Sequence, residues 1–252
     1  MCDLYWLTDE QMDRLRPFFP KSHDKPRVDD CRVLSGIIFV NRNGLLWRDA
    51  PREYGPHKTL YNRWKCWSAM GIFIRMMEEL APGKAEPQRI MIDATYLKAH
   101  RTASSLRFKK GGPGRLIGRT KGGMNTKLHA VTDRNGRPLD FFMTAGQGSD
   151  YTGAAALLDG LPPAEWMLAD RGYDVDWFRG VLEEKGIKPC IPGRKSRGNP
   201  VKYDKRKYKR RNRIEIMFDR LKDWRRVATR YDRCPNVFFL ATCLAATVLF
   251  WL

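Results

Sequence analysis

The sequence lacks the cysteine and histidine patterns of a zinc protein or a disulfide-stabilised domain. Its six cysteines are scattered with no C-x-x-C pair, and its four histidines form no cluster with them. Structural zinc sites need closely spaced cysteines and histidines, and small secreted domains need a regular cysteine framework. Both classes are therefore excluded, and the cysteine usage fits a reducing cytosol.

A membrane-spanning segment is not expected either. The first residues, MCDLYWLTDEQ, carry acids where a signal peptide would carry basic residues followed by an apolar run. The C-terminal stretch VFFLATCLAATVLFWL is apolar nearly throughout, but its 16 residues fall short of the roughly 20 that cross a bilayer. Because a helix that is apolar on all sides is usually buried, we expect a core helix here and a cytoplasmic protein without membrane contact. A membrane anchor is the alternative.

Acidic residues are scarce relative to basic ones. The 252 residues include 47 Lys and Arg against 28 Asp and Glu, a formal net charge of +19, while 42% hydrophobic residues indicate a packed globule. Such an excess charge repels itself in a free compact protein, so a polyanionic partner is expected. Nucleic acid is the first interpretation; a membrane surface or a ribosomal role is the alternative.

The first 80 residues show the periodicity of several short helices joined by tight turns, which resembles a helix-turn-helix arrangement. In the helix expected after Thr59, a polar side formed by Tyr61, Arg63 and Lys65 could contact DNA. The alternative is a helical subdomain with ordinary solvated charges. Residues 81–88, APGKAEPQ, have the composition of a linker.

From Arg89 onward the pattern changes to alternating strands and helices. The predicted order is three strands, then helix, strand, helix, strand and a helical C-terminal part, which indicates an α/β fold with a mixed sheet flanked by helices. The glycine-rich basic segment 107–123 lacks the G-K-[ST] of a phosphate-binding Walker motif. We interpret it as a loop whose charges are available to phosphates.

Two aspartates occur in or at the end of predicted strands. Asp93 lies inside IMIDATY, and Asp170 closes WMLADRGY. Acids are depleted in strands, and an ionised carboxylate beside a buried apolar run is costly unless it is paired or binds a metal. Each alone is commonly a strand-end cap or a salt-bridge partner. Two of them at the ends of separate strands favour a functional site, because such sites gather where strand ends meet.

Glu215 is a single acid in the basic stretch YKRRNRIEIMF. If the segment is one continuous α-helix, turning about 100° per residue, Tyr208, Arg211, Glu215 and Lys222 share an arc of about 60°. One interpretation is an ordinary ion pair of Arg211 with Glu215 at i, i+4. The other is that Glu215 holds a cation that is not a side chain. Helix geometry alone leaves both open.

The spacing Tyr208-x2-Arg211-x3-Glu215-x6-Lys222 resembles the Y-R-E-K signature of bacterial insertion-sequence transposases of the DDE class. The segments MIDATYLKAHRTASS, GRTKGGMNTKLHAVTD, GQGSDYTGAAALL, LADRGYD and CIPGRKSR are similar to the branch called insertion sequence family five. The resemblance covers nearly the whole chain.

This resemblance implies a ribonuclease-H-like catalytic domain over residues 89–252, preceded by an all-helical DNA-binding domain over residues 1–80. The implied catalytic and metal-binding carboxylates are Asp93, Asp170 and Glu215. The implied cofactor is Mg²⁺, with Mn²⁺ as a substitute; an all-oxygen ligand set suits such ions. The residues expected to contact DNA are Tyr208, Arg211, Lys222, Arg63 and Lys65.

The implied activity is binding of the terminal inverted repeats, strand cleavage, and joining of the 3′-hydroxyl ends to target DNA, by a homodimer in the nucleoid of a bacterium. Only 44 residues separate Asp170 from Glu215, so the β-rich insertion of some relatives is absent and hairpin-type end processing is left open. Two alternatives remain at this point. One is a ribonuclease-H-like nuclease or resolvase without strand transfer, and the other is a non-catalytic DNA-binding relic.

Overall fold

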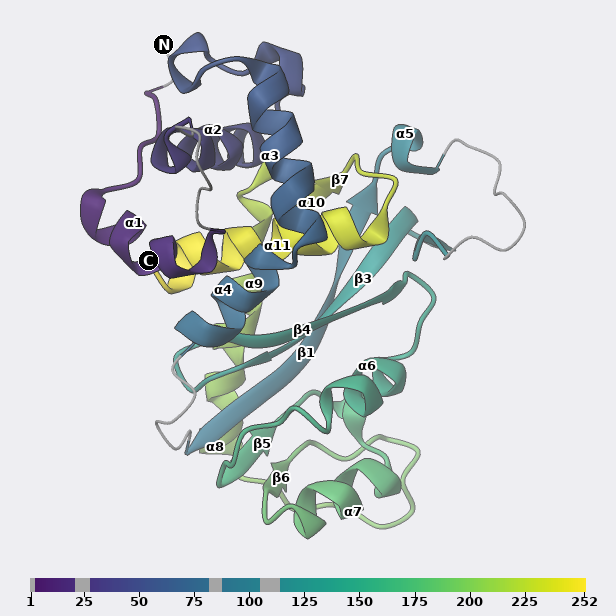
Figure 1. Ribbon diagram of the computed structural model, residues 1–252. Coiled ribbons are helices and arrows are strands. Elements are labelled where there is room, and N and C mark those ends of the chain that lie inside the picture. Colours follow the sequence, from purple (N-terminus) through teal and green to yellow (C-terminus); the bar gives the residue numbers. More distant parts are fainter. Residues whose placement is uncertain (1–2, 21–27, 82–87, 105–113) are drawn as a thin grey trace. The chain divides into compact units, whose positions relative to one another are not determined.

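The computed structural model describes residues 3–20, 28–81, 88–104 and 114–252 (Figure 1). The chain forms two compact units. One comprises Met1–Leu80 together with Leu221–Leu252, and the other comprises Ala81–Arg220. We call them the helical unit and the sheet unit, and each is described by itself.

The helical unit is built from short helices whose ends follow from local sequence. The Thr8 hydroxyl accepts from the Gln11 N–H, and the Gln11 side chain accepts from the Thr8 N–H, which starts the first helix with a capping box. Gly44, with a φ of 69°, ends the second in the left-handed conformation that glycine tolerates best. The elements are α1 (Asp9–Leu15), η1 (Arg16–Phe18), α2 (Asp30–Asn43), η2 (Trp47–Asp49), η3 (Arg52–Tyr54), α3 (His57–Ala69), α4 (Ile72–Leu80), α10 (Arg225–Ala228), β7 (Thr229–Arg230) and α11 (Pro235–Phe250).

The apolar C-terminal segment forms α11, and the expectation of a buried core helix is confirmed. Its residues from Leu240 to Thr247 are all buried, and the helix packs against α4. Across the described residues, no helix is both long enough and apolar enough to cross a membrane. The contact between α4 and α11 is what joins the two ends of the chain into one unit.

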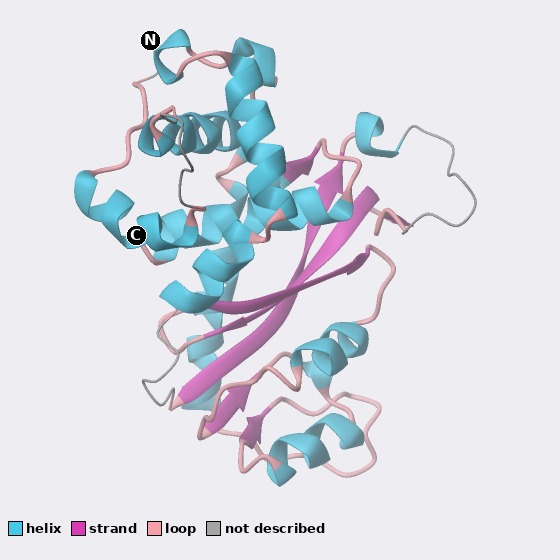
Figure 2. Cartoon of the chain, viewed as in Figure 1, coloured by secondary structure: helices cyan, strands magenta, loops and turns pink. Residues whose placement is uncertain are grey.

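The sheet unit contains one mixed sheet. The strands that this unit contributes are β1 (Arg89–Ala99), β2 (Gly118–Thr120), β3 (Gly123–Thr132), β4 (Pro138–Ala145), β5 (Trp166–Leu168) and β6 (Lys188–Cys190). The order is β2-β3-β1-β5-β6, and β4 also pairs with β3. The strand β1 is antiparallel to β3 on one side and parallel to β5 on the other, and β5 is parallel to β6 (Figure 2).

Helices cover a face of the sheet on which apolar strand residues are buried. Ile90 and Ile92 of β1 pack with Leu157 of α6 (Asp150–Leu157) and with Phe178 and Leu182 of α7 (Asp176–Glu184). The remaining elements of this part of the chain are α5 (Arg101–Ser104), η4 (Arg171–Tyr173), α8 (Lys205–Tyr208), η5 (Lys209–Arg211) and α9 (Asn212–Lys222). The predicted α/β architecture is confirmed: a mixed sheet flanked by helices, with an all-helical N-terminal region.

Two details differ from the sequence analysis. The helix expected to run unbroken through Tyr208 and beyond Lys222 consists of α8, the 3-10 turn η5 and α9, and a separate α10 follows. The predicted boundary at residue 89 assigns everything after it to the catalytic domain, whereas residues 221–252 pack in the helical unit. The predicted linker 81–88 lies mostly outside the described residues, as does the first part of the glycine-rich loop 107–123.

Candidate active site

Asp93 and Asp170 lie side by side on one face of the sheet. The parallel register pairs Arg89 with Trp166 and Met91 with Leu168. Continued by two residues, it brings Asp170 next to Asp93, and neighbouring strands are about 4.8 Å apart. The two carboxylates also interact electrostatically, since the charge of Asp170 raises the pKa of Asp93. The expected proximity of the two aspartates is therefore present, but Asp93 lies in the middle of β1 and not at its end.

The Asp93 side chain is largely withdrawn from water, with 16% of it exposed. Its Oδ1 accepts a 2.8 Å hydrogen bond from the Ala94 N–H, and its Oδ2 accepts a 2.6 Å bond from Nη1 of Arg211. Burial is the largest influence on its pKa and raises it to about 6, against the lowering effect of Arg211. One guanidinium therefore does not fully compensate the negative charge of this site.

Asp170 is held in place by the turn that follows it. Its Oδ1 accepts a 2.7 Å hydrogen bond from the Gly172 N–H, which caps η4. A Cβ atom on residue 172 would lie 2.7 Å from that same oxygen, so any side chain here would displace the Asp170 carboxylate. The Oδ2 atom of Asp150 would lie 3.4 Å from the same point. A further carboxylate therefore stands beside Asp170.

Glu215 is linked to Asp93 through Arg211. The Arg211 guanidinium forms an ion pair with Glu215 as well as with Asp93, and it lies 5.8 Å from the ring of Tyr208. The i, i+4 ion pair considered for Glu215 is thus formed, but its arginine also reaches a strand 118 residues away in sequence. The side chain of Glu215 is 52% exposed, whereas that of Arg211 is only 15% exposed. Of the four signature residues, Arg211 therefore contacts both Tyr208 and Glu215.

The donor chemistry of these side chains fits a divalent cation, although no metal geometry is formed. Among the described residues, no three His, Cys, Asp or Glu side chains are grouped closely enough to hold a metal ion. Mg²⁺ prefers oxygen ligands, and Asp93 and Asp170 present carboxylates on one face. The raised pKa of Asp93 shows that added positive charge would be favoured there. Arg211 now supplies a cationic group between Asp93 and Glu215.

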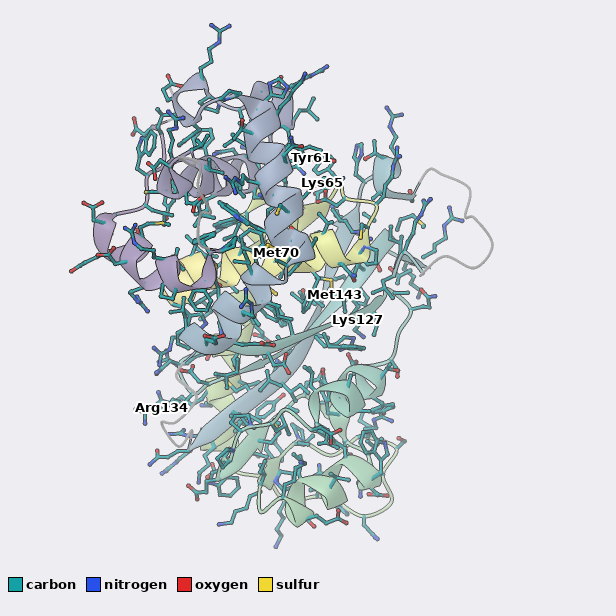
Figure 3. The ribbon with its side chains drawn as sticks, viewed as in Figure 1. Tyr61, Lys65, Met70, Lys127, Arg134 and Met143 are labelled. Carbon is teal, nitrogen blue, oxygen red and sulfur yellow. The ribbon has the colours of Figure 1, made fainter. Side chains whose placement is uncertain are left out.

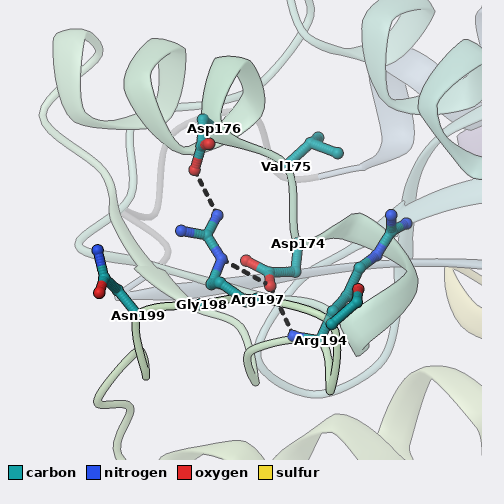
Figure 4. Close-up of a pocket in the computed structure, with 8 residues that line it drawn as sticks. Asp174, Val175, Asp176, Arg194, Arg197, Gly198 and Asn199 are labelled. Carbon is teal, nitrogen blue, oxygen red and sulfur yellow. Dashed lines mark hydrogen bonds and ion pairs between the residues drawn. The ribbon is translucent and has the colours of Figure 1, made fainter.

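The turn after Asp170 is anchored by a network of hydrogen bonds and ion pairs around Asp174 (Figure 4). The fully buried Asp174 carboxylate accepts from Nε of Arg179 at 2.8 Å, from Nε of Arg197 at 3.1 Å and from the Arg194 N–H at 2.7 Å. The Arg194 side chain in turn donates to the carbonyls of Arg171 and Gly172. This network ties the segment after β6 to the turn that orients Asp170, beside an open cavity of about 420 Å³.

Sequence reasoning missed Asp150 and Lys127. Lys127 on β3 is buried, and its Nζ forms a 2.8 Å ion pair with Asp150 and a 3.3 Å hydrogen bond to the Gly148 carbonyl (Figure 3). A lysine inside an apolar strand pattern was the available signal, because a buried ammonium needs a partner. The partner follows the helix cap Ser149 and stands near Asp170.

The predicted N-terminal contacts, Arg63 and Lys65, lie on α3 in the helical unit. The Arg63 guanidinium lies 5.9 Å from the Trp67 ring and the Lys65 Nζ lies 5.8 Å from the Tyr61 ring (Figure 3). These cations therefore lie along aromatic rings of their own helix. A groove of about 680 Å³ runs past Tyr61 and is bordered also by Trp47, Arg48, His57 and Lys58. Lys222, the fourth signature residue, is the last residue of α9.

Family models match both parts of the chain. Residues 84–251 match the family described as "Transposase DDE domain", and residues 7–77 match "Putative transposase of IS4/5 family". The first of these covers more than half of the chain and includes Asp93, Asp170 and Glu215.

Curated relatives agree with the family models. The chain is 36% identical over 131 residues to "Putative transposase for insertion sequence element IS6501" of Brucella ovis, covering 51% of this chain and 99% of that protein. It is 27% identical over 181 residues to "Putative transposase for insertion sequence element IS402" of Burkholderia cepacia, covering 59% and 83%.

Solved structures show a weaker likeness. The crystal structure of a pre-cleavage Mos1 transpososome matches at 13% identity and a TM-score of 0.27, covering 94% of this chain and 83% of that chain. The Mos1 mariner paired end complex with Mn matches at 12% identity and the same TM-score, covering 82% of each. Scores this low carry no functional argument, so the assignment rests on the sequence matches. The chain belongs to the DDE transposases of bacterial insertion sequences.

Proposed function

We propose that this transposase binds the terminal inverted repeats of its insertion sequence, cleaves DNA strands at those ends and joins the 3′-hydroxyls to target DNA. The proposal is carried by one observation: Asp93 and Asp170 share a face of the sheet, and Arg211 links Asp93 to Glu215. Phosphodiester cleavage and joining need anionic ligands for divalent metal in such a place. This assignment includes strand transfer, which separates it from a nuclease or resolvase.

The three carboxylates would hold Mg²⁺, with Mn²⁺ as a substitute. When bound, such an ion activates the attacking water or hydroxyl and neutralises the leaving oxygen. The Gly172 N–H fixes one oxygen of Asp170, and the Ala94 N–H fixes one oxygen of Asp93, so both are oriented before DNA arrives. Preset ligands reduce the reorganisation needed for reaction.

Basic and aromatic residues of the signature and of α3 would hold the DNA. Tyr208, Arg211 and Lys222 are proposed to position backbone phosphates near the site. In the free protein Arg211 is bound to carboxylates, so its phosphate contact would follow once a metal ion neutralises Asp93 and Glu215. Arg63 and Lys65 of α3 are proposed to contribute to recognition of the ends, and a homodimer would bring two ends together.

The test uses the purified full chain and duplex DNA that carries the element's end. We expect strand nicking with Mg²⁺ or Mn²⁺, none in EDTA, and joined products when target DNA is added. Glu215→Gln should abolish nicking while DNA binding persists, because the substitution keeps size and removes only the charge that holds a cation. Asp219→Asn is the matched control, since it removes the same charge one turn further along α9 from an exposed position.

Three results would contradict the proposal. Equal cleavage in EDTA would rule out the metal. Near wild-type nicking by Glu215→Gln would mean that Glu215 is only an ion-pair partner of Arg211. Nicking without any joined product would favour the nuclease interpretation. For end recognition, the double substitution Arg63→Ala with Lys65→Ala should reduce the preference for repeat over scrambled DNA, and an unchanged preference would place specificity elsewhere.

A further inference from the structure

Four arginines surround a small cavity on the sheet unit that none of the roles above includes. The cavity has a volume of about 230 Å³. Its arginines come from three separate places in the sequence: the start of β1, the turn between β3 and β4, and the η5–α9 junction. They are Arg89, Arg134, Arg210 and Arg213. No carboxylate lines the cavity within the described part of the chain.

Within the described ranges, the four side chains also have no acidic partner. Among the residues that the structure describes, none of the four guanidiniums has a hydrogen bond or an ion pair with an acid. Arg134, Arg210 and Arg213 are exposed, and Arg89 is half-buried. By contrast, Arg211, next to two of them in sequence, is fully engaged by Asp93 and Glu215. Four like charges converging without an acid repel one another, so the arrangement favours a bound anion.

The turn that carries Arg134 is rigid and is held against Arg213. Asp133 accepts from the N–H groups of Asn135 and Arg137 at 2.8 and 2.9 Å and from Nε of Arg137 at 2.9 Å. The charge of Asp133 is therefore used inside the turn, by Arg137 and two backbone N–H groups. Gly136, with a φ of 81°, lies so close to Arg213 that a Cβ there would be 2.6 Å from the Arg213 carbonyl oxygen. The cavity is thus preformed by backbone packing.

The cavity opens on the same face of the sheet as the catalytic carboxylates. Its floor is Met91 of β1 and Leu168 of β5, which are paired in register. Because side chains alternate along a strand, residues two apart share a face, and Asp93 and Asp170 lie about 7 Å further along. A DNA strand advances roughly 3.4 Å per nucleotide along its axis. The cavity therefore lies one to a few nucleotides from the proposed cleavage position.

We propose that this arginine cavity binds a single backbone phosphate of the DNA strand beside the scissile phosphate. Planar guanidiniums match phosphate oxygens by paired, charge-assisted hydrogen bonds. The apolar floor of Met91 and Leu168 excludes water beneath the anion and strengthens those bonds. The inference rests on the proposed function, and it adds a phosphate position that sets how the strand lies across Asp93 and Asp170.

The first experiment compares DNA binding by the full chain and by the double variant Arg134→Ala with Arg213→Ala. Both substitutions keep the Cβ atoms, so the contact of Gly136 with residue 213 is retained. We expect affinity for end DNA to fall at least about tenfold and the slope of log K against log salt to drop by about 0.9, as for one phosphate. Lys185→Ala is the charge control, at the end of α7 on the opposite face of the sheet. It should leave both quantities unchanged.

The second experiment locates the phosphate. End DNA is made with one neutral methylphosphonate at each of several positions around the mapped nick. For the wild type, one substitution near the nick should weaken binding as much as the double variant does, and the double variant should be insensitive to that same substitution. Inorganic phosphate, titrated as a competitor, tests whether the cavity instead takes a free anion.

The outcomes separate this inference from the proposed function. If the wild type nicks with Mg²⁺ but both proteins respond alike to every methylphosphonate, the cavity assignment is wrong and the function stands. Competition by low inorganic phosphate, without a position-specific methylphosphonate effect, would also overturn it by assigning the cavity to a free anion. If the wild type neither binds nor nicks end DNA, the proposed function fails and the backbone-phosphate assignment fails with it.

Discussion

Replacement of the buried Asp174 by Asn tests the network that anchors the turn after Asp170. The side chain of Asp174 has 0% exposure, while its partners Arg179 and Arg197 have 11% and 23%. Asn is nearly isosteric, and its single amide oxygen could still accept from one of the three donors. Its NH₂ group would face the remaining donors. Because Asn is neutral, Arg179 would also lose its counter-charge in a mostly buried place.

Breaking a buried charge pair from one side typically costs 3–5 kcal/mol, because the remaining charge is left uncompensated. Since Asn keeps part of the hydrogen bonding and Arg197 retains Asp176, we expect the lower end, about 3 kcal/mol. For a chain of this size that corresponds to a fall in melting temperature of roughly 6–12 °C. The turn bearing Gly172 should loosen as well, so nicking should decrease beyond what the folded fraction explains.

The assay is urea unfolding at several pH values, with Asp176→Asn as the matched control. Asp176 is 88% exposed and loses only its ion pair with Arg197, so its change should stay below about 1 kcal/mol. Burial alone would raise the pKa of Asp174, but the Arg194 N–H and the Arg179 and Arg197 guanidiniums together lower it.

A lowered folded-state pKa contributes stability above the unfolded pKa that is lost as pH falls. The difference between wild type and Asp174→Asn should therefore be largest near neutral pH and shrink in acid. A loss no greater than that of Asp176→Asn, or a difference that grows in acid, would refute the reasoning.

Three further predictions follow from named contacts. In metal-free buffer, Asp93→Asn should stabilise the protein at pH 8 by up to about 3 kcal/mol and not at pH 4. The reason is that the pKa of Asp93 is raised from 3.8 to about 6 in the folded state, so stability is lost as pH rises through that range. Urea unfolding at both pH values checks this, and an equal effect at both would contradict it. Arg211→Ala should raise the pKa of Asp93 further, since the guanidinium lowers it. The pH at which stability is lost should then shift upward in the same urea measurement. An unshifted pH midpoint would show that the ion pair of Arg211 with Asp93 is not formed in solution. A fragment of residues 1–80 should be less folded by circular dichroism than the same residues joined through a flexible linker to residues 221–252, because α4 packs on α11; equal helicity and equal melting would show that the fragment is independent.

Short-range patterns in the sequence were sufficient for much of this molecule. The capping box at Thr8 and Gln11 defines the start of α1, because both bonds lie within four residues. The short apolar run in IMIDATY indicates a strand, and the long apolar run in the C-terminal segment indicates a buried helix, since burial follows from hydrophobic patterning. The spacing of Tyr208, Arg211, Glu215 and Lys222 resembles a known signature and indicated the family, which the family models confirm.

The break in the signature helix could not be read from the sequence. A basic run such as KYKRRN carries no glycine or proline that would interrupt an α-helix, yet η5 separates α8 from α9. The sequence pattern also left the roles of Arg211 and Glu215 open, because they depend on a long-range contact. Arg211 bonds to Asp93, 118 residues away, and no local rule predicts that contact.

What the sequence by itself determined is the set of elements and the family, because both depend on neighbouring residues and their spacing. The tertiary structure alone decided which distant residues meet. The parallel register of β1 and β5 brings Asp93 beside Asp170, and the approach of Gly136 to Arg213 gathers arginines from three segments into one cavity. Residues 221–252 join the helical unit rather than the sheet unit, because α11 buries its apolar surface against α4. These pairings depend on which surfaces exclude water together, and that is a property of the folded chain as a whole.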